Sequence, residues 1–407
     1  MSNEPIFIVG IPRSGTTLLA AMLAAHSRLS CGPETHFFRW LSRTDVRRLC
    51  ESQTWPEPAA DFIRSIRHKA FLPGTARTLL EKYEIPEGSI PAYLQTKAPS
   101  VPSMLCSVTE QYMKAKGKAR WVEKTPDHLR YLSSIREYFT DSPIIRIVRD
   151  PRDVALSLMR VPWGARSLLE GLLHWQRLDS MSREFVGTDR LAYTVRFEDL
   201  VSSPREELRK LCRFVNETFE EGMLDTSSSG TAINSRNVPW KSKVSQGADV
   251  TRVAVWRSEL TRRENQLAEA VLGDRLAALG YPTDEEFSRV GEVYPRSGVA
   301  EEYAEALAIL ASKGVRLWKA RPDEKSRAKI YLGEPSTAEW LGEQRTGRAI
   351  RVLPVLADIA RATIRFNDLY WIPNREDGKW TGCASFVLRQ FLSPYKVVLN
   401  PCDPTVS

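Results

Sequence analysis

Residues that hold transition metals are scarce in this 407-residue sequence, which contains six cysteines and five histidines. No two cysteines form a CxxC pair and no histidine stands at zinc-ligand spacing from a cysteine, so we expect no metal site. The cysteines are also too scattered for a disulfide scaffold, and we expect free, mostly buried thiols in a reducing compartment. They are Cys31, Cys50, Cys106, Cys212, Cys383 and Cys402.

Long apolar runs are absent as well. No stretch approaches the ~18 uncharged apolar residues of a membrane-spanning helix. The opening MSNEPIFIVG has no basic segment ahead of an apolar stretch, as a signal peptide would. We therefore expect a cytoplasmic protein without a transmembrane segment. The balance of 42% hydrophobic and 27% charged residues excludes a mostly disordered or collagen-like chain.

The charge balance is basic, because 58 Lys and Arg against 50 Asp and Glu give a net charge of +8. This favours anionic partners, which include nucleic acids, membrane surfaces and phosphorylated small molecules. The charge alone does not choose among them. Taken by itself, it is also consistent with a non-catalytic module that binds a nucleotide or another polyanion.

Short apolar runs alternate with helical segments over the first 280 residues. This order predicts an α/β fold of the P-loop-like, three-layer kind, with a central parallel sheet flanked by helices. The predicted strands are Pro5–Ile11, Ala119–Glu123, Ile144–Val148 and Leu191–Val195. The predicted helices include Thr16–Ala25, Pro126–Tyr138, Pro151–Met159 and Arg166–Phe185.

Helix boundaries and loops give the remaining organisation. Two pairs of residues have the spacing of capping boxes: Ser203 with Glu206, and Thr261 with Glu264. The helix that begins after Thr261 should run to Gly280. The polar segment 220–255 is expected to be a long loop. We place the first domain at residues 1–282. Residues 283–407 form a C-terminal extension of mixed or mainly helical structure whose role the sequence does not reveal.

A glycine-rich turn between the first strand and the first helix predicts a phosphate site. Gly10 and Gly15 are five residues apart, the GxxxxG frame in which successive backbone N–H groups face an anion at a helix N-terminus. The intervening and following residues are polar or turn-forming, which argues against an ordinary strand–turn–helix corner. The candidate ligand-binding residues are Pro12, Arg13, Ser14, Gly15, Thr16 and Thr17.

This loop differs from that of nucleotide triphosphatases. Thr16 stands where those enzymes carry a lysine, and Arg13 lies inside the loop instead. No strand ends in an acid suited to Mg²⁺, since Asp150 is better explained as a helix cap. The loop therefore suits a phosphate or phosphosulfate handled without metal. A P-loop-like kinase is the alternative enzyme class, and these two differences argue against it.

A second anion site is indicated by Arg149 and Ser157. Arg149 ends a strand, and ligands of parallel sheets lie at the carboxyl ends of strands. Ser157, eight residues later, could share the helix face toward that edge. A solvated arginine beside a helix start is the simpler interpretation of Arg149 alone. Lys243, in a polar basic stretch, is a candidate to close over the same group.

Two separate anion sites match a nucleotide phosphorylated on both its 5′ and 3′ sides. Here the sequence resembles the sulfotransferase family, which uses 3′-phosphoadenosine-5′-phosphosulfate (PAPS) as co-substrate. IPRSGTT resembles the family's 5′-phosphosulfate loop and IVRDPRDVALS its 3′-phosphate motif. The stretches FEDL at 197–200 and Val255–Trp256–Arg257 extend the resemblance over about residues 5–280.

Within that family, the sequence is most similar to tyrosylprotein sulfotransferases and their bacterial relatives. They share the loop arginine and a Cys-Gly-x-Glu-Thr stretch, here Cys31–Thr35. The resemblance implies Glu34 as catalytic base, with Lys124 of Glu-Lys-Thr-Pro contacting the transferring group. His36, where the animal enzymes carry an arginine, is the alternative base. Arg13 and Lys124 would stabilise charge on the departing phosphate and the equatorial oxygens.

The sequence thus predicts an enzyme that moves the sulfuryl group of PAPS to an acceptor hydroxyl by in-line displacement. The sequence does not identify the acceptor, which is a carbohydrate, a lipid, a small molecule or a tyrosyl group. It also leaves open whether the protein is a monomer or a homodimer. The animal tyrosyl enzymes are membrane-anchored and disulfide-bonded, whereas this sequence shows no anchor, and Glu123 rather than a cysteine directly precedes Lys124. We expect neither a nucleic-acid partner nor a metal cofactor.

Overall fold

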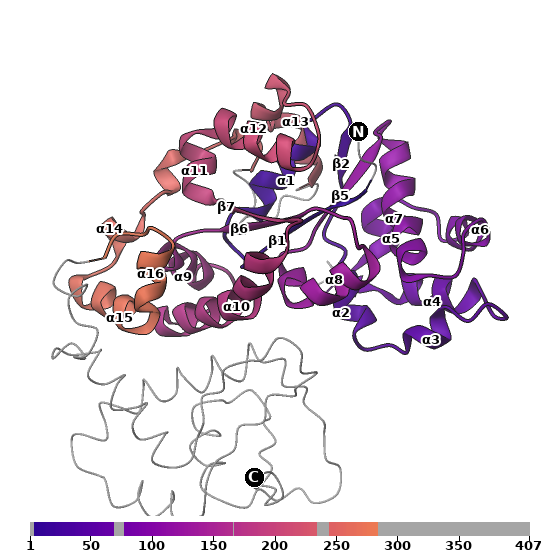
Figure 1. Ribbon diagram of the computed structural model, residues 1–407, viewed down its shortest axis with the longest axis horizontal. Helices are drawn as coiled ribbons and strands as arrows, with labels where there is room; N and C mark the ends of the chain where they lie inside the picture. The colour runs from indigo at the N-terminus through magenta and orange to yellow at the C-terminus, as the bar shows by residue number, and fades with distance from the viewer. Residues whose placement is uncertain (1–3, 69–76, 166, 234–243, 284–407) are drawn as a thin grey trace, which may run out of the picture. The chain divides into compact units, whose positions relative to one another are not determined.

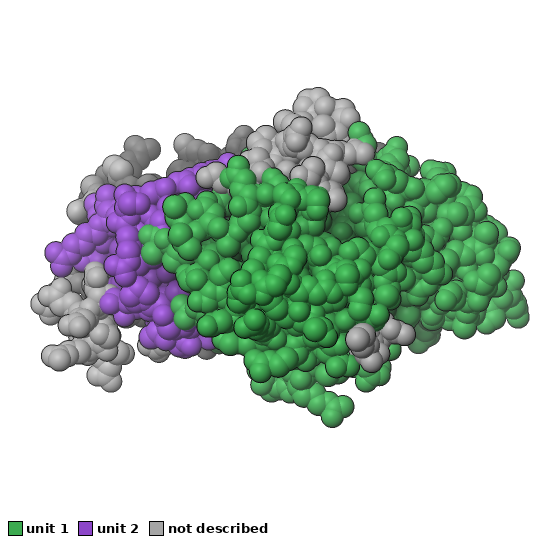
Figure 2. Space-filling model, turned by 90° about the horizontal axis from the view of Figure 1, so that it is seen from above, with its two compact units in different colours: residues 1–149, 161–163, 181–254 green, residues 150–160, 164–180, 255–407 purple. Residues whose placement is uncertain are grey.

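A computed structural model describes residues 4–68, 77–165, 167–233 and 244–283 of the chain. Lys243 and nearly all of the predicted C-terminal extension lie outside these residues, so the extension and the domain boundary at 282 stay predictions. The described chain divides into two compact units, coloured separately in Figure 2. The first consists of residues 1–149, 161–163 and 181–254, and the second of residues 150–160, 164–180 and 255 onward.

The first unit is built on a five-stranded sheet (Figure 1). Its strand order is β2-β5-β1-β6-β7, and every neighbouring pair is parallel. This confirms the predicted α/β fold with a parallel sheet between helices. The strands are β1 (Ile6–Gly10), β2 (Leu29–Cys31), β5 (Arg120–Lys124), β6 (Ile144–Val148) and β7 (Ala192–Arg196). A separate antiparallel ribbon pairs β3 (Arg67–His68) with β4 (Arg77–Thr78).

Strands β1, β2, β5 and β6 are buried on both faces, whereas the edge strand β7 is partly exposed. Successive side chains point to opposite faces. Ile6 and Ile8 pack on one face in a cluster with Leu19 of α1 (Thr16–Ala24). Phe7 points to the other face, where its ring meets those of Trp121 and Phe139 at centroid distances of 5.8 and 5.0 Å.

Helices cover the two faces. Figure 1 shows α1, α12 and α13 on one side of the sheet, with α2 and α8 on the other. The helices of this unit are α2 (Phe37–Leu41), α3 (Val46–Leu49), α4 (Glu57–Ser65), α5 (Leu79–Tyr83), α6 (Ser89–Gln95), α7 (Val101–Ala115), α8 (Leu132–Tyr138), α11 (Phe197–Ser202), α12 (Pro204–Phe214) and α13 (Ser227–Ile233), with 3₁₀ turns η1 (Pro126–Tyr131), η2 (Glu221–Leu224) and η4 (Val250–Arg252).

The second unit joins residues 150–160 and 164–180 to the stretch from residue 255 onward. It contains α9 (Pro151–Met159), α14 (Trp256–Glu259), α15 (Arg262–Leu272), α16 (Asp274–Ala278) and part of α10 (Leu168–Thr188). Asp153 accepts a hydrogen bond from the backbone N–H of Trp256 at 2.8 Å, and the Arg152 guanidinium lies 3.5 Å from the Trp256 ring centroid. These contacts place the Val-Trp-Arg stretch of the sequence against the Arg-Asp-Pro-Arg-Asp stretch.

Asp150 has the capping role predicted for it. Its side chain accepts from the backbone N–H of Arg152, and Pro151 occupies the first turn of α9. It also binds the Arg152 guanidinium at 2.8 Å. The capping box at Thr261 and Glu264 is likewise confirmed, with both of its hydrogen bonds present.

Four local predictions were wrong. Ser203 makes no side-chain cap bond, although it lies between the end of α11 at Ser202 and the start of α12 at Pro204. The helix expected to run to Gly280 breaks at Gly273, which has φ 45°. The segment predicted as one helix over 126–138 is 3₁₀ before Leu132. The expected loop 220–255 contains η2, α13 and η4 within its described part.

Candidate active site

The strand order brings four predicted site residues to one edge of the sheet. Glu34 follows β2, Lys124 ends β5, Arg13 follows β1 and Arg149 follows β6. Because all these strands are parallel and adjacent, their carboxyl ends share an edge, where α/β proteins bind ligands. Residues far apart in the sequence therefore line up in the order in which their strands pair.

The phosphate loop is a tight turn that two glycines make possible. Arg13 and Gly15 have φ angles of 77° and 98°, and the N–H of Ser14 donates to the Ile11 carbonyl at 3.1 Å. A Cβ on Gly15 would lie 2.4 Å from the Phe197 ring. A Cβ on Gly10 would lie 2.7 Å from the backbone oxygen of Ile147. Both positions thus exclude a side chain, and the loop backbone can close around a ligand.

The loop presents a polar group that the rest of the described chain does not satisfy. The Ser14 hydroxyl is fully buried and has no hydrogen-bond partner there. Buried hydroxyls are normally hydrogen-bonded. Gly15 lies at the N-terminus of α1, a nine-residue helix whose first N–H groups carry partial positive charge. The residues present therefore fit a phosphate or sulfate group at this position.

Positive charge gathers beside the loop. Burial, together with repulsion from Arg252 and Arg149, lowers the pKa of Arg13 to about 10, against a smaller opposite effect of Glu34. Three guanidinium groups so close together repel one another. A bound anion would relieve this repulsion.

Arg149 is held rigidly in this cluster. It is buried, and its Nη2 donates to the backbone oxygen of Arg252 at 2.7 Å, while Nη1 donates to that of Arg13 at 3.3 Å. Its guanidinium lies 4.7 Å from the Phe197 ring centroid. Ser157, the other predicted residue of the second anion site, belongs to the other compact unit. Its part in that site stays a prediction, as does that of Lys243.

Glu34 and Lys124 form an ion pair at the same edge. Lys124 Nζ lies 2.6 Å from Glu34 Oε1, with the lysine side chain 1% exposed and the glutamate 19%. His36 Nε2 lies 3.6 Å from Glu34 Oε2. The candidate base, the candidate contact to the transferring group and the alternative base are therefore neighbours. A carboxylate that is partly exposed beside a buried cation can reach an incoming hydroxyl.

His36 is neutral at neutral pH. Burial lowers its pKa to about 4, although Glu34 and Asp127 act in the opposite direction. Its backbone is left-handed, with φ 51°, at the position before α2. A proton taken up by His36 is thus held weakly, which makes it a poorer proton acceptor than an unperturbed histidine.

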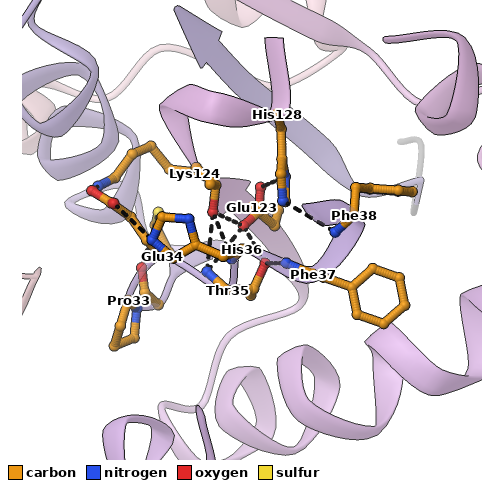
Figure 3. A network of polar contacts seen from close by, with 12 residues as sticks. Pro33, Glu34, Thr35, His36, Phe37, Phe38, Glu123, Lys124 and His128 are labelled. Carbon is orange, nitrogen blue, oxygen red and sulfur yellow. Dashed lines mark hydrogen bonds and ion pairs between the residues drawn. The ribbon is translucent and has the colours of Figure 1, made fainter. Parts of the chain in front are cut away.

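A buried hydrogen-bond network lies directly behind these residues (Figure 3). The Glu123 carboxylate is fully buried and accepts from the hydroxyls of Thr35 and Thr125 at 2.7 and 2.6 Å. Its second oxygen lies 2.8 Å from His128 Nδ1. Burial raises the pKa of Glu123, but His128 and the two hydroxyls outweigh it and lower the pKa below its usual value. Glu123 is therefore ionised.

Tyr83 holds the other side of the same loop. Its hydroxyl donates to the Pro33 carbonyl at 2.6 Å. A Cβ on Gly32 would lie 2.4 Å from the Tyr83 ring, so only glycine allows this approach. The loop that carries Glu34 is fixed on both sides.

Sequence reasoning missed several residues of the site. Phe197 was noted only within the FEDL stretch, and Arg252, Glu123 and His128 were not singled out. The adjacency of Glu123 to Lys124 was a signal, since a charged residue in a buried strand requires a partner.

Other predictions concern metals, cysteines and membrane segments. Within residues 4–68, 77–165, 167–233 and 244–283 there is no cluster of three or more His, Cys, Asp or Glu side chains that could hold a metal ion. In those same ranges no helix combines the length and apolarity needed to cross a membrane. The four described cysteines, Cys31, Cys50, Cys106 and Cys212, are free thiols, and two of them are buried.

Several known proteins are similar to this chain in sequence or structure. A zebrafish (Danio rerio) protein named protein-tyrosine sulfotransferase 1 is 27% identical over 287 residues, covering 68% of this chain and 72% of the relative. The nodulation protein NoeE of Sinorhizobium fredii is 25% identical over 331 residues, covering 73% and 71%. The solved sulfotransferase domain from the curacin biosynthetic pathway is 20% identical, with a TM-score of 0.47, covering 70% and 99%.

The family comparison covers the phosphate loop, Glu34, Lys124 and Arg149. The profile described as the sulfotransferase family matches residues 5–221, which is more than half of the chain. The resemblance inferred from the motifs is thereby confirmed, and the chain belongs to the sulfotransferase family of enzymes.

Proposed function

We propose that this enzyme transfers the sulfuryl group of PAPS to an acceptor hydroxyl. The observation that carries the proposal is the meeting of two features at one sheet edge. One is the anion site of Arg13, Arg149 and the buried Ser14 hydroxyl. The other is the ion pair of Glu34 with Lys124 beside it. The first suits a doubly phosphorylated nucleotide, and the second suits a reaction that removes a proton from a hydroxyl.

The nucleotide is placed by its two anionic ends. The phosphosulfate lies in the loop of residues 11–17, where Arg13, the Ser14 hydroxyl and the N-terminus of α1 bind it. The 3′-phosphate lies at Arg149, and Ser157 and Lys243 stay further ligands predicted from the sequence. No step of this assignment uses a metal ion, because arginines carry the charge that Mg²⁺ carries in kinases.

The chemical step is a displacement at sulfur. The acceptor oxygen forms a bond to sulfur while the bond from sulfur to the 5′-phosphate oxygen breaks, which leaves adenosine 3′,5′-bisphosphate. The acceptor proton passes to Glu34, a step worth ~10²–10⁴-fold in rate. Arg13 and Lys124 stabilise negative charge on the leaving phosphate and the sulfuryl oxygens.

Glu34 is preferred to His36 as the base. Glu34 is ion-paired with the buried Lys124, and it is the residue that the resemblance to tyrosylprotein sulfotransferases implies as the base. Desolvation lowers the pKa of His36 to about 4, which leaves the imidazole no more basic than an ordinary carboxylate, so it has no advantage over Glu34 as a base. His36 Nε2 lies 3.6 Å from the second carboxylate oxygen of Glu34, so it is a neighbour of the proposed base.

The acceptor class is a hydroxyl compound, and a tyrosyl group is one candidate. It is supported by the similarity to the zebrafish protein named protein-tyrosine sulfotransferase 1. Carbohydrates, lipids and small alcohols are the others.

The test is turnover of labelled PAPS against a panel of these acceptors, with mass spectrometry of the products. We expect the transfer of sulfate to at least one hydroxyl acceptor, unchanged when a chelator is present. ATP serves as the competing donor. Phosphate transfer from ATP, or binding of PAPS that needs a divalent metal, would favour the kinase alternative. Binding of PAPS without transfer to any acceptor would favour a nucleotide-binding module.

A further inference from the structure

Two adjacent residues of β5, Glu123 and Lys124, contact the loop that carries Glu34. Side chains of successive strand residues point to opposite faces. Lys124 contacts the Glu34 carboxylate, and Glu123, one residue earlier, contacts Thr35 from the other side. Strand β5 therefore touches two consecutive residues of the loop from two directions, as Figure 3 shows.

Four consecutive backbone N–H groups of this loop are held by side chains. The Thr125 hydroxyl accepts from the N–H groups of Thr35 and His36 at 3.0 and 3.3 Å. The Thr35 hydroxyl accepts from the N–H of Phe37 at 3.2 Å. His128 Nε2 accepts from the N–H of Phe38 at 3.4 Å. The loop after β2 thus has a fixed conformation before α2 begins.

Thr125 is the central member of the network. Its hydroxyl donates its single proton to Glu123 Oε1 and uses its lone pairs for the two amides. This satisfies the full capacity of a hydroxyl group. The geometry holds only if Glu123 is an ionised acceptor, which agrees with its lowered pKa.

The proton on His128 can be assigned from its partners. The N–H of Phe38 can only donate, so Nε2 of His128 must accept and carries no proton. Nδ1 then carries the proton and donates it to Glu123 Oε2. In this arrangement the His128 imidazole accepts from the Phe38 N–H and donates to the Glu123 carboxylate.

We propose that Glu123, Thr125 and His128 are positioning residues that hold the Glu34 loop so that Glu34 stays against Lys124. The inference rests on the proposed function, in which Glu34 accepts the proton of the acceptor hydroxyl. It explains why a carboxylate and an imidazole are fully buried behind a loop of an enzyme site. It also explains the left-handed backbone of His36, which the Thr125 hydroxyl stabilises through its amide.

The test compares Thr125→Val, which keeps the shape and removes the hydroxyl, with Thr125→Ser, which keeps the hydroxyl. We expect Thr125→Val to lower kcat about 10–100-fold through displacement of Glu34, with KM for PAPS little changed. Thr125→Ser should recover most of kcat. Glu217→Gln is the matched control. Glu217 is also a fully buried carboxylate, but it binds Arg120 at the start of β5 and not the loop that carries Glu34.

A double variant shows whether Thr125 acts through Glu34. In the Glu34→Gln background, Thr125→Val should change kcat by no more than about twofold, because the positioned group is gone. An equal loss in both backgrounds would overturn the inference, and so would a kcat loss in Glu217→Gln as large as that in Thr125→Val. Either result would mean that only general stability was lost.

Hydrogen exchange provides a readout that does not depend on turnover. In native conditions Thr125→Val should speed amide exchange at residues 35–38 about tenfold or more, while Thr125→Ser and Glu217→Gln should not. Unchanged exchange in Thr125→Val would overturn the inference whatever the activity. Failure of the proposed function is seen separately, as a wild-type enzyme that transfers no sulfate.

Discussion

Lys124 Nζ and Glu34 Oε1 lie 2.6 Å apart although 90 residues separate them in the chain. The contact exists because β2 and β5 are neighbours, with Cys31 paired to Val122. It places a buried cation against a carboxylate that solvent still reaches. An acceptor hydroxyl that enters here meets a base and a positive charge together, which is what a displacement at an anionic sulfuryl group requires.

The first prediction concerns proton transfer. Glu34→Gln keeps the shape of the side chain and removes the base, so kcat should fall at least ~10²-fold. Nucleotide affinity, measured by calorimetry, should change little, because Glu34 lies outside the phosphate loop. An acceptor with a more acidic hydroxyl, such as an activated phenol, should partly restore turnover.

His36→Ala is the matched control for that experiment, since His36 lies 3.6 Å from the same carboxylate. We expect it to alter KM for the acceptor more than kcat. Loss of turnover in His36→Ala with full activity in Glu34→Gln would reverse the two roles. A loss confined to KM in Glu34→Gln would make Glu34 an acceptor-binding residue.

The sequence predicts the strands around the phosphate loop well, and the reason is physical. In Ile144–Val148 every residue but Arg146 is apolar and the strand is buried on both faces, so its pattern is clear, and its bounds are as predicted. The three-residue strand Leu29–Cys31 is too short to leave a pattern. Without it, the place of Glu34 beside Lys124 could be implied only by family resemblance.

Side-chain networks were harder to predict than strands. The contacts of Glu123 with Thr35 and His128 depend on how a loop and a 3₁₀ turn pack, which periodicity does not encode. The spacing of Ser203 and Glu206 likewise did not reveal that Ser203, which lies between α11 and α12, makes no capping bond. The sequence motifs predicted where the site lies, whereas the hydrogen bonds among its side chains could be found only from the structure.

The second prediction concerns the 3′-phosphate. Arg149→Gln should weaken binding of adenosine 3′,5′-bisphosphate by about 1.5–3 kcal/mol, or roughly 10–150-fold, since a charge-assisted bond is lost. Adenosine 5′-phosphate lacks the 3′ group and should lose little affinity. Ser157→Ala should show the same selectivity on a smaller scale. Equal weakening of both nucleotides, measured by calorimetry, would contradict the assignment.

The third prediction concerns the loop backbone. Gly15→Ala forces a side chain into φ 98° and places a Cβ 2.4 Å from the Phe197 ring, so we expect a loss of about 1–3 kcal/mol in the free energy of unfolding. Gly88→Ala is the control, because Gly88 has φ −68° and no atom within 4 Å of its Cβ position. Urea unfolding that shows equal stability for the two variants would refute this account of Gly15.

The last prediction concerns pH. The folded protein holds the pKa of His36 at about 4, below its ordinary 6.5, because the imidazole is buried. Between these two pH values the unfolded chain binds a proton that the folded chain does not, so acidification favours unfolding. The contribution of His36 to stability is therefore intact above about pH 6.5 and declines as the pH falls to about 4. His36→Gln should remove this decline, which amounts to at most about 3 kcal/mol, in urea unfolding curves recorded across the range.

Glu34 acts on the same group in the opposite direction, since its carboxylate raises the pKa of His36. In Glu34→Gln the imidazole should therefore titrate at still lower pH, as followed by the NMR signal of its Cε1 proton. A His36 signal that titrates near pH 6.5 in both proteins would show that the imidazole is not buried against Glu34.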